Sequence, residues 1–212
     1  LKYGDGDRRL HERKDIAERI AACFSEVFSW AKKDIRTELP LQHVVKTVKL
    51  SKRMITDKEY DFAVKSLAPL MEQPFSSEGT PEERLFKNST LVAQRARFQR
   101  IIHRYETQKA DPRLPMEMHV LRLGDIAFAS NRFELYMDYM HRIQARSPFL
   151  QTFVIQLAGV PGEDGGTYLA TRRGAQGKGY SACLFCNQVS PAGGQQLVEQ
   201  TVKTLQKLKE TK

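Results

Sequence analysis

A glutamate and two tyrosines in the last third of the chain have side chains and settings suited to chemistry. Glu134 stands near the end of residues 123–135, where a pattern typical of a strand runs into one typical of a helix. Tyr168 and Tyr180 stand in glycine-bounded segments, Gly-Gly-Thr-Tyr-Leu-Ala-Thr and Gly-Lys-Gly-Tyr-Ser-Ala. A rigid element that ends in a loop holds a side chain still and leaves it reachable. We interpret the three residues as half of a metal hydrolase site whose other half lies outside this chain.

Each of these residues also has an ordinary structural interpretation. Glu134 could favour the N-terminus of the following helix through the helix dipole. Tyr168 and Tyr180 could be half-buried loop tyrosines with an apolar ring and a solvated hydroxyl. These alternatives stay open on the residues alone.

The other residues that could do chemistry give weaker signals. The histidines show no His-x₃-His or His-Glu-x-x-His spacing, although His141 follows Glu134 by two helical turns and could lie near the outer part of the site. For His119, on a predicted strand, we expect no ligand role. Cys183 and Cys186 have Cys-x-x-Cys spacing, but on a predicted strand such positions point to opposite faces. We therefore expect neither a redox nor a metal role for this pair.

Composition places few limits on function. The 212 residues, 41% hydrophobic and 28% charged, suit one large or two small globular domains. No apolar run approaches the roughly 18 residues that span a bilayer, and the polar N-terminus lacks a signal-peptide pattern. The first residue is not Met, so we expect a fragment or a processed chain. Three cysteines are too few for a disulfide framework, which makes a reducing, cytoplasmic setting the default.

The net charge of +9 is most simply a solvated basic surface. The densest run, residues 82–109, carries seven basic and three acidic side chains. This run could dock against a more acidic part of the same protein or an anionic membrane surface. A nucleic-acid partner is disfavoured because the run has no reading motif and no stacking aromatics.

Periodicity and turn signals predict alternating helices and strands. Thr56 with Glu59, and Thr80 followed by Pro81, are helix-start signals. We expect helices over residues 12–37, 56–70, 80–108, 132–145 and 193–209. We expect strands over 42–50, 116–123, 125–129, 151–158 and 180–187, and glycine-rich loops over 159–167 and 174–179.

These elements predict an α/β fold, a mixed sheet flanked by helices with a helix-rich first half. We expect residues 1–212 to form a single domain, the C-terminal half of a larger catalytic domain. The Pro-rich segment 111–115 is a possible internal sub-boundary.

Residues 123–190 resemble the C-terminal part of the catalytic domain of the neutral/alkaline, non-lysosomal ceramidase family. That family has a Gly-Asp-[Leu/Ile]-Ala stretch leading to a glutamate, as residues 124–127 lead to Glu134 here. A Tyr-[Leu/Val]-Thr-Thr segment follows in the family, and Tyr168-Leu-Ala-Thr fills its place. A second family tyrosine follows twelve residues later, which is Tyr180 here. The match covers roughly a third of the chain.

The chain departs from the family pattern in three places. The family's Pro-Gly-Glu is Arg132-Phe133-Glu134 here, and the Glu-Gly after its second tyrosine is Ser181-Ala182. The family's His-x-His-Ser-Gly-like run is absent from these residues. The resemblance therefore implies a divergent member whose histidine ligands lie outside this chain.

The resemblance implies zinc chemistry on an N-acyl amide. Glu134 and Tyr168 would ligate zinc, and a catalytic zinc needs about three or more protein ligands with an open position for water. Tyr180 would donate its hydroxyl to the developing oxyanion, a contribution on the order of 3 kcal/mol. The partners would be the remaining N-terminal part of the protein and an amide or lipid-like substrate. The fragment alone would be inactive.

The alternative is a non-catalytic scaffold that keeps the fold and uses residues 82–109 as a basic docking face.

Overall fold

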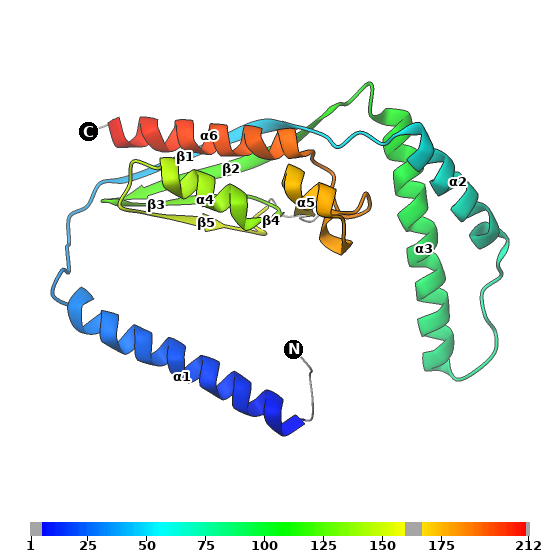
Figure 1. The fold of residues 1–212 in the computed structure, drawn as a ribbon, viewed down its shortest axis with the longest axis horizontal. Coiled ribbons are helices and arrows are strands. Elements are labelled where there is room, and N and C mark those ends of the chain that lie inside the picture. The colour runs from blue at the N-terminus through cyan, green and yellow to red at the C-terminus, as the bar shows by residue number, and fades with distance from the viewer. Residues whose placement is uncertain (1–5, 160–166, 211–212) are drawn as a thin grey trace. The chain divides into compact units, whose positions relative to one another are not determined.

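A computed structural model describes residues 6–159 and 167–210, which fall into two compact units, Leu1–Leu39 and Pro40–Lys212. The first unit holds α1 (Gly6–Ala31) (Figure 1). This helix begins and ends six residues earlier than the predicted helix over 12–37. Its end tightens into turns in which Lys33 and Asp34 donate their N–H groups to the carbonyls three residues earlier. The segment 111–115 lies inside the second unit. Whether both units belong to one larger catalytic domain stays a prediction.

Two helices follow the first strand of the second unit, and both begin as the sequence predicts. In α2 (Asp57–Glu72) the Thr56 hydroxyl accepts from the Glu59 N–H at 3.3 Å, while the Glu59 carboxylate accepts from the Thr56 N–H at 3.0 Å. Thr80 and Glu83 make the same reciprocal pair at the start of α3 (Pro81–Thr107). Such a capping box satisfies N–H groups that have no partner within the helix. The two helices lie side by side (Figure 1).

Four strands form a mixed sheet, which confirms the α/β class. The strands are β1 (Leu41–Ser51), β2 (Arg113–Leu123), β3 (Ile126–Ser130) and β5 (Gln151–Ile155), in the order β1-β2-β3-β5. β2 pairs antiparallel with β1 and β3, whereas β3 pairs parallel with β5. The sequence left open whether residues 125–129 continue the strand over 116–123 or form its hairpin partner, and the structure shows the hairpin. β5 ends three residues before the predicted strand end.

β2 starts earlier than predicted and includes Pro115. Proline lacks the N–H that a sheet ladder requires. His119 lies four residues after Pro115, so the backbone N–H positions of the two residues face the same side of β2. The His119 N–H points away from β1 and donates to the Ser130 hydroxyl at 3.2 Å. The missing N–H of Pro115 faces this same side, and β3 pairs only with residues 120–123. The strand therefore tolerates the proline that we read as a break.

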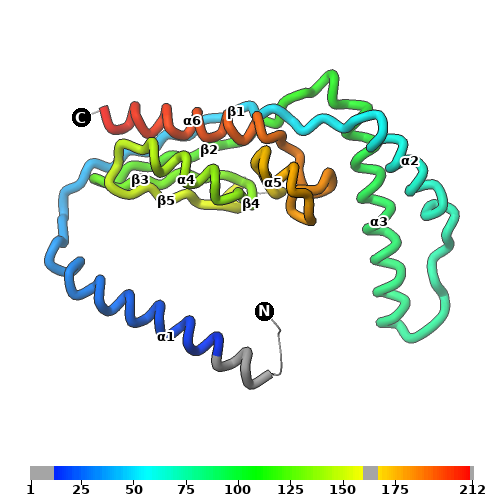
Figure 2. Tube along the Cα trace, viewed as in Figure 1, coloured from blue at the N-terminus to red at the C-terminus, as the bar shows by residue number. Residues whose placement is uncertain are grey.

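Two helices, α4 (Met137–Arg146) and α6 (Pro191–Glu210), contact the sheet and each other (Figures 1 and 2). Alternate strand residues, such as Leu50, Met118 and Val120, are fully buried in the resulting core. The intervening strand residues lie on the opposite face of the sheet, and this face is open: Val45 is 48% exposed and Phe153 is 42% exposed. Within the described ranges, no helix is both long and apolar enough to cross a bilayer.

The region of the predicted site departs most from the sequence expectations. The predicted helix over 132–145 starts only at Met137, because Glu134–Leu135 forms the short strand β4, which pairs parallel with β6 (Tyr168–Leu169). The predicted loop 174–179 is largely the short helix α5 (Arg172–Gly177), and the predicted strand 180–187 is a 3-10 turn, η1 (Tyr180–Ala182), followed by further turns. The predicted loop 159–167 lies almost wholly outside the described residues.

Candidate functional site

The pairing of β4 with β6 places Glu134 beside Tyr168. The two residues are Cα partners in the parallel register, and the Glu134 N–H donates to the Thr167 carbonyl at 3.1 Å. The next residue of each strand, Leu135 and Leu169, is buried in the core. Because successive strand side chains point to opposite faces, Glu134 and Tyr168 project together away from the core. Glu134 is therefore not at a helix N-terminus, which removes the dipole interpretation.

The backbone around Glu134 is held by amide side chains. Buried Asn131 accepts from the Phe133 N–H at 3.0 Å and donates to the Ile155 carbonyl at 3.1 Å. Gln156 accepts from the Leu135 N–H at 2.6 Å. These bonds fix a strand of only two residues on both sides of Glu134. The site glutamate is thus held from β5 as well as from β6.

Tyr168 lies between Glu134 and Tyr180 and contacts both. A hydrogen bond from the Tyr168 hydroxyl to Glu134, followed by burial and the carboxylate charge, raises the pKa of Tyr168. The Tyr180 ring lies edge-on to the Tyr168 ring, with centroids 5.9 Å apart. The three residues singled out from the sequence are therefore neighbours. Tyr180 is 73% exposed, so it is the member most open to an incoming molecule.

Two cysteines extend this cluster beyond Tyr180. The charge of Cys186 and a hydrogen bond to its sulfur raise the pKa of Tyr180. Burial and the hydrogen bond with Cys183 raise the pKa of Cys186. Burial opposes ionisation of Cys183, but hydrogen bonds from Cys186 and nearby backbone N–H groups, with the Arg97 charge, outweigh it and lower the Cys183 pKa. The turn replaces the predicted strand, so the expectation that the two thiols point apart is wrong.

Asn187 and Arg104 hold the turn in place, and neither stood out in the sequence. Asn187, 3% exposed, accepts from the Ala170 N–H at 2.9 Å and donates to the carbonyls of Ser181 and Cys183 at 2.7 and 3.2 Å. It therefore ties the end of β6 to the turn that carries Tyr180. Buried amides of this kind have no local sequence signal, because their partners lie far away along the chain.

Arg104 fixes the same turn to α3. Its guanidinium donates to the carbonyls of Arg53, Leu184 and Asn187 at 2.9–3.1 Å. Burial, with the like charge of Arg53, lowers the pKa of Arg104 to about 10. Arg104, a basic residue of the run 82–109, therefore binds carbonyls within the fold and is not a free surface charge. Arg95 and Arg84 also donate to carbonyls of their own chain.

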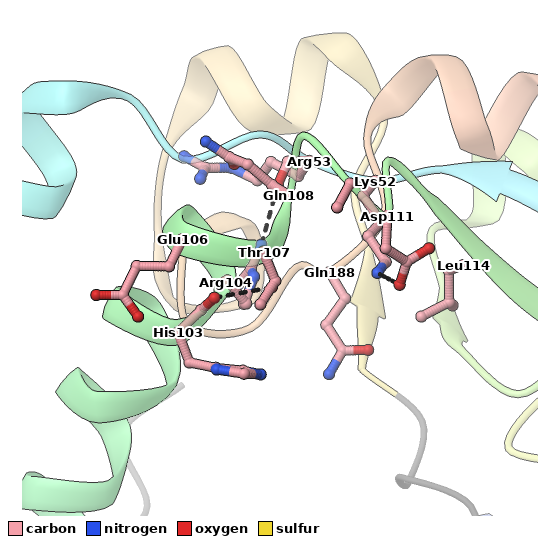
Figure 3. Close-up of a pocket in the computed structure, with 11 residues that line it drawn as sticks. Lys52, Arg53, His103, Arg104, Glu106, Thr107, Gln108, Asp111, Leu114 and Gln188 are labelled. Carbon is pink, nitrogen blue, oxygen red and sulfur yellow. Dashed lines mark hydrogen bonds and ion pairs between the residues drawn. The ribbon is translucent and has the colours of Figure 1, made fainter.

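A hollow of about 600 Å³ opens beside Arg104 (Figure 3). Several of its polar side chains are already paired: Lys52 forms an ion pair with Asp111, and Gln108 bonds the N–H and carbonyl of Ile55. Glu134, Tyr168 and Tyr180 do not line it.

The histidines do not complete a metal shell with Glu134. The His119 and His43 rings share a hydrogen bond of 3.0 Å on the open face of the sheet, and His119 also bonds Glu117 at 2.9 Å. His141 lines a different hollow, with Asp138 and residues 171–173. Over residues 6–159 and 167–210, no group of three or more His, Cys, Asp or Glu side chains could hold a metal ion.

The donor chemistry of the Glu134–Tyr168 pair nevertheless fits part of a zinc shell. Zinc accepts carboxylate oxygens at about 2.0–2.2 Å. Glu134 and Tyr168 are Cα partners in the parallel register, so their oxygens project from neighbouring positions and could face one ion. No protein-family model, curated protein or solved structure matches this chain.

Proposed function

We propose that this chain carries half of the catalytic site of a zinc-dependent amide hydrolase resembling the non-lysosomal ceramidases. One observation carries the proposal: Glu134 and Tyr168 are paired in register, and the Tyr180 ring lies edge-on to the Tyr168 ring. These residues lie at the positions that the family resemblance assigns to two zinc ligands and an amide-contacting tyrosine. They come from three separate segments, so the fold brings together what the sequence keeps apart.

Each residue has a defined role in the proposal. Glu134 and Tyr168 would hold the metal through oxygen, with Tyr168 losing its hydroxyl proton on binding. Zinc, when bound, would supply a water acidic enough to act as hydroxide near neutral pH. Tyr180 would turn its hydroxyl from Cys186 toward the amide oxygen and donate a hydrogen bond as negative charge builds there.

The missing ligands would come from another part of the protein. The open face of the sheet supports this, because it presents exposed Val45, Phe153 and Ile155 and the stacked rings of Phe128 and Phe153. Apolar side chains gathered on one face favour coverage by a further layer. We expect that layer to carry the histidines and the apolar part of the substrate pocket.

Hydrolysis of N-acyl amides by the zinc-loaded, full-length protein tests the proposal. Tyr180→Phe removes only the donor, so we expect kcat to fall about 10²–10³-fold with little change in KM. Tyr105→Phe is a matched control, because its hydroxyl bonds Asp57 on the neighbouring helix rather than the site. Equal activity of wild type and Tyr180→Phe would refute the role of Tyr180. Loss of activity in both variants would point to folding instead.

The non-catalytic alternative stays a prediction with less support. A docking face needs cations that are available to a partner. In the run 82–109, Arg84, Arg95 and Arg104 donate to carbonyls of their own chain. Part of the basic charge of the run thus serves the packing of α3.

A further inference from the structure

The Cys-x-x-Cys segment forms a tight turn that brings its two ends together. The Cys186 N–H donates to the Cys183 carbonyl at 3.2 Å, the i to i+3 hydrogen bond of a β-turn. Such a turn brings its first and fourth Cα atoms within about 7 Å. Disulfides form across Cα separations of about 4.4–6.8 Å. The backbone therefore already holds these cysteines at a spacing that a disulfide can bridge.

Neighbouring groups hold this turn firmly. Asn187 donates to the carbonyls of Ser181 and Cys183, and Arg104 donates to those of Leu184 and Asn187. Both cysteines are free and half-buried, so their thiols remain open to solvent on one side. The anchored turn, closed by the bond from the Cys186 N–H to the Cys183 carbonyl, holds the two residues near each other without a disulfide.

A cation stands beside the thiols. The Arg97 guanidinium lies 3.8 Å from the centroid of the Phe185 ring, within the same turn. Phe185 also packs edge-on against Phe98 of α3, which fixes its position. Arg97 is exposed, so its charge is accessible to a small anion that approaches the thiols. This setting suits a disulfide reagent that carries carboxylates.

We propose that Cys183 and Cys186 form a thiol–disulfide exchange site that accepts small anionic disulfides, such as oxidised glutathione, beside Arg97. This inference rests on the turn and its surroundings and does not depend on the proposed zinc chemistry. On the predicted strand, Cys183 and Cys186 would have pointed to opposite faces and could not have formed a disulfide.

The exchange proceeds in two displacements. The Cys183 thiolate attacks one sulfur of the reagent, which breaks the reagent's S–S bond, forms a mixed disulfide and releases one thiolate. Cys186 gives its proton to that departing thiolate or to water, and its sulfur then attacks the Cys183 sulfur. This step closes the Cys183–Cys186 disulfide and releases the second reagent thiol. Overall the two protein thiols are oxidised, and one reagent disulfide is reduced to two thiols.

Oxidation would also release Tyr180. In the reduced chain Tyr180 interacts with the charge and sulfur of Cys186, which raise the Tyr180 pKa. A disulfide sulfur is a poor acceptor, so closing the bridge would free the Tyr180 hydroxyl to reorient. The redox state of the pair would thereby set the position of the most exposed aromatic side chain in the cluster.

The test uses the full-length protein carrying Cys23→Ser, which removes the exposed cysteine of α1. The folded protein is treated with oxidised glutathione, and its products are identified by peptide mass and thiol titration. We expect an internal Cys183–Cys186 disulfide, reversed by reduced glutathione, and no lasting adduct. Adding Cys186→Ser should trap a stable glutathione adduct on Cys183. Adding Arg97→Ala should slow the reaction several-fold, and salt should slow only the form that keeps Arg97.

Three results would overturn the proposal. One is that both thiols of the folded protein stay free under excess oxidised glutathione, while the unfolded chain forms the bridge. Another is that each thiol carries its own glutathione, which would mean that the sulfurs cannot reach each other. The last is a bridge that forms at the same rate with and without Arg97, which would remove the anionic reagent from the assignment. Circular dichroism of each variant separates these results from misfolding.

Discussion

Asn187 offers the sharpest test of how the candidate site is held together. This buried amide joins the Ala170 N–H at the end of β6 to two carbonyls of the turn that carries Tyr180 and the cysteines. Asn187→Ala removes all three bonds and leaves the other side chains of the site unchanged. It therefore tests the support of the cluster rather than its chemistry.

The expected loss follows from the burial of each partner. Ala170 is 3% exposed, so its N–H would be left unsatisfied at a cost of about 1–3 kcal/mol. The carbonyls of Ser181 and Cys183 lie on a half-buried turn where water can partly replace the lost bond, at about 0.5–1.5 kcal/mol each. Together we expect a destabilisation of about 2–6 kcal/mol.

Urea unfolding measures this loss. With a slope of about 2 kcal/mol per molar urea, the midpoint should fall by about 1–3 M without a change in slope. The thiols of Cys183 and Cys186 should also react faster with a thiol reagent in the native variant, because the turn is loosened.

Asn88→Ala is the matched control. Asn88 bonds the N–H and carbonyl of Ser76 in a half-exposed setting near the start of α3, where water can replace both bonds. We expect it to lose less than about 1 kcal/mol. If Asn187→Ala destabilised the protein no more than Asn88→Ala, and left thiol reactivity unchanged, the assigned role of Asn187 would be wrong.

Other predictions follow from packing and charge. The bidentate bond from Arg146, with help from Gln195, lowers the pKa of Glu199 from 4.5 to about 2. Because the folded pKa is depressed, the stabilisation from Glu199 should be complete above about pH 4.5 and lost as pH falls toward 2; the difference in Tm between wild type and Glu199→Gln should shrink over that interval. A Cβ at Gly193 would lie 2.5 Å from the Ser51 carbonyl oxygen, so Gly193→Ala should destabilise by about 1–3 kcal/mol in urea unfolding. Arg104→Met keeps an apolar stem but leaves three carbonyls without their donor, and should lower the free energy of unfolding by about 2–4 kcal/mol; a change below 0.5 kcal/mol would contradict its role.

Elements with local signals were predictable from the sequence. The starts of α2 and α3 were located correctly because a threonine, a nearby glutamate and, at Pro81, a proline specify a helix start within four residues. The strands over 116–123 and 125–129 were also found from their alternating runs, but the sequence left open whether the second continues the first or pairs with it as a hairpin. In these cases the determining contacts lie close together along the chain.

The site region was harder to predict because its structure depends on distant partners. Residues 134–135 form a strand only because Tyr168–Leu169 pairs with them, and nothing local distinguishes them from the start of a helix. Residues 180–187 have the apolar, aromatic character of a strand, yet Asn187 and Arg104 hold them as turns. The closeness of Glu134, Tyr168 and Tyr180 was expected from family resemblance, and their contacts with the cysteines were not.

Zinc content of the full-length protein tests the central proposal most directly. Wild type, Glu134→Ala and Tyr168→Phe would be purified under metal-replete conditions and analysed by elemental mass spectrometry, with Tyr105→Phe as the control. We expect about one zinc per chain in wild type and in the control, because a catalytic site holds a single ion. Zinc should fall well below that ratio in both site variants. A wild type without zinc, or site variants that keep their full metal content, would contradict the assignment of Glu134 and Tyr168 as zinc ligands.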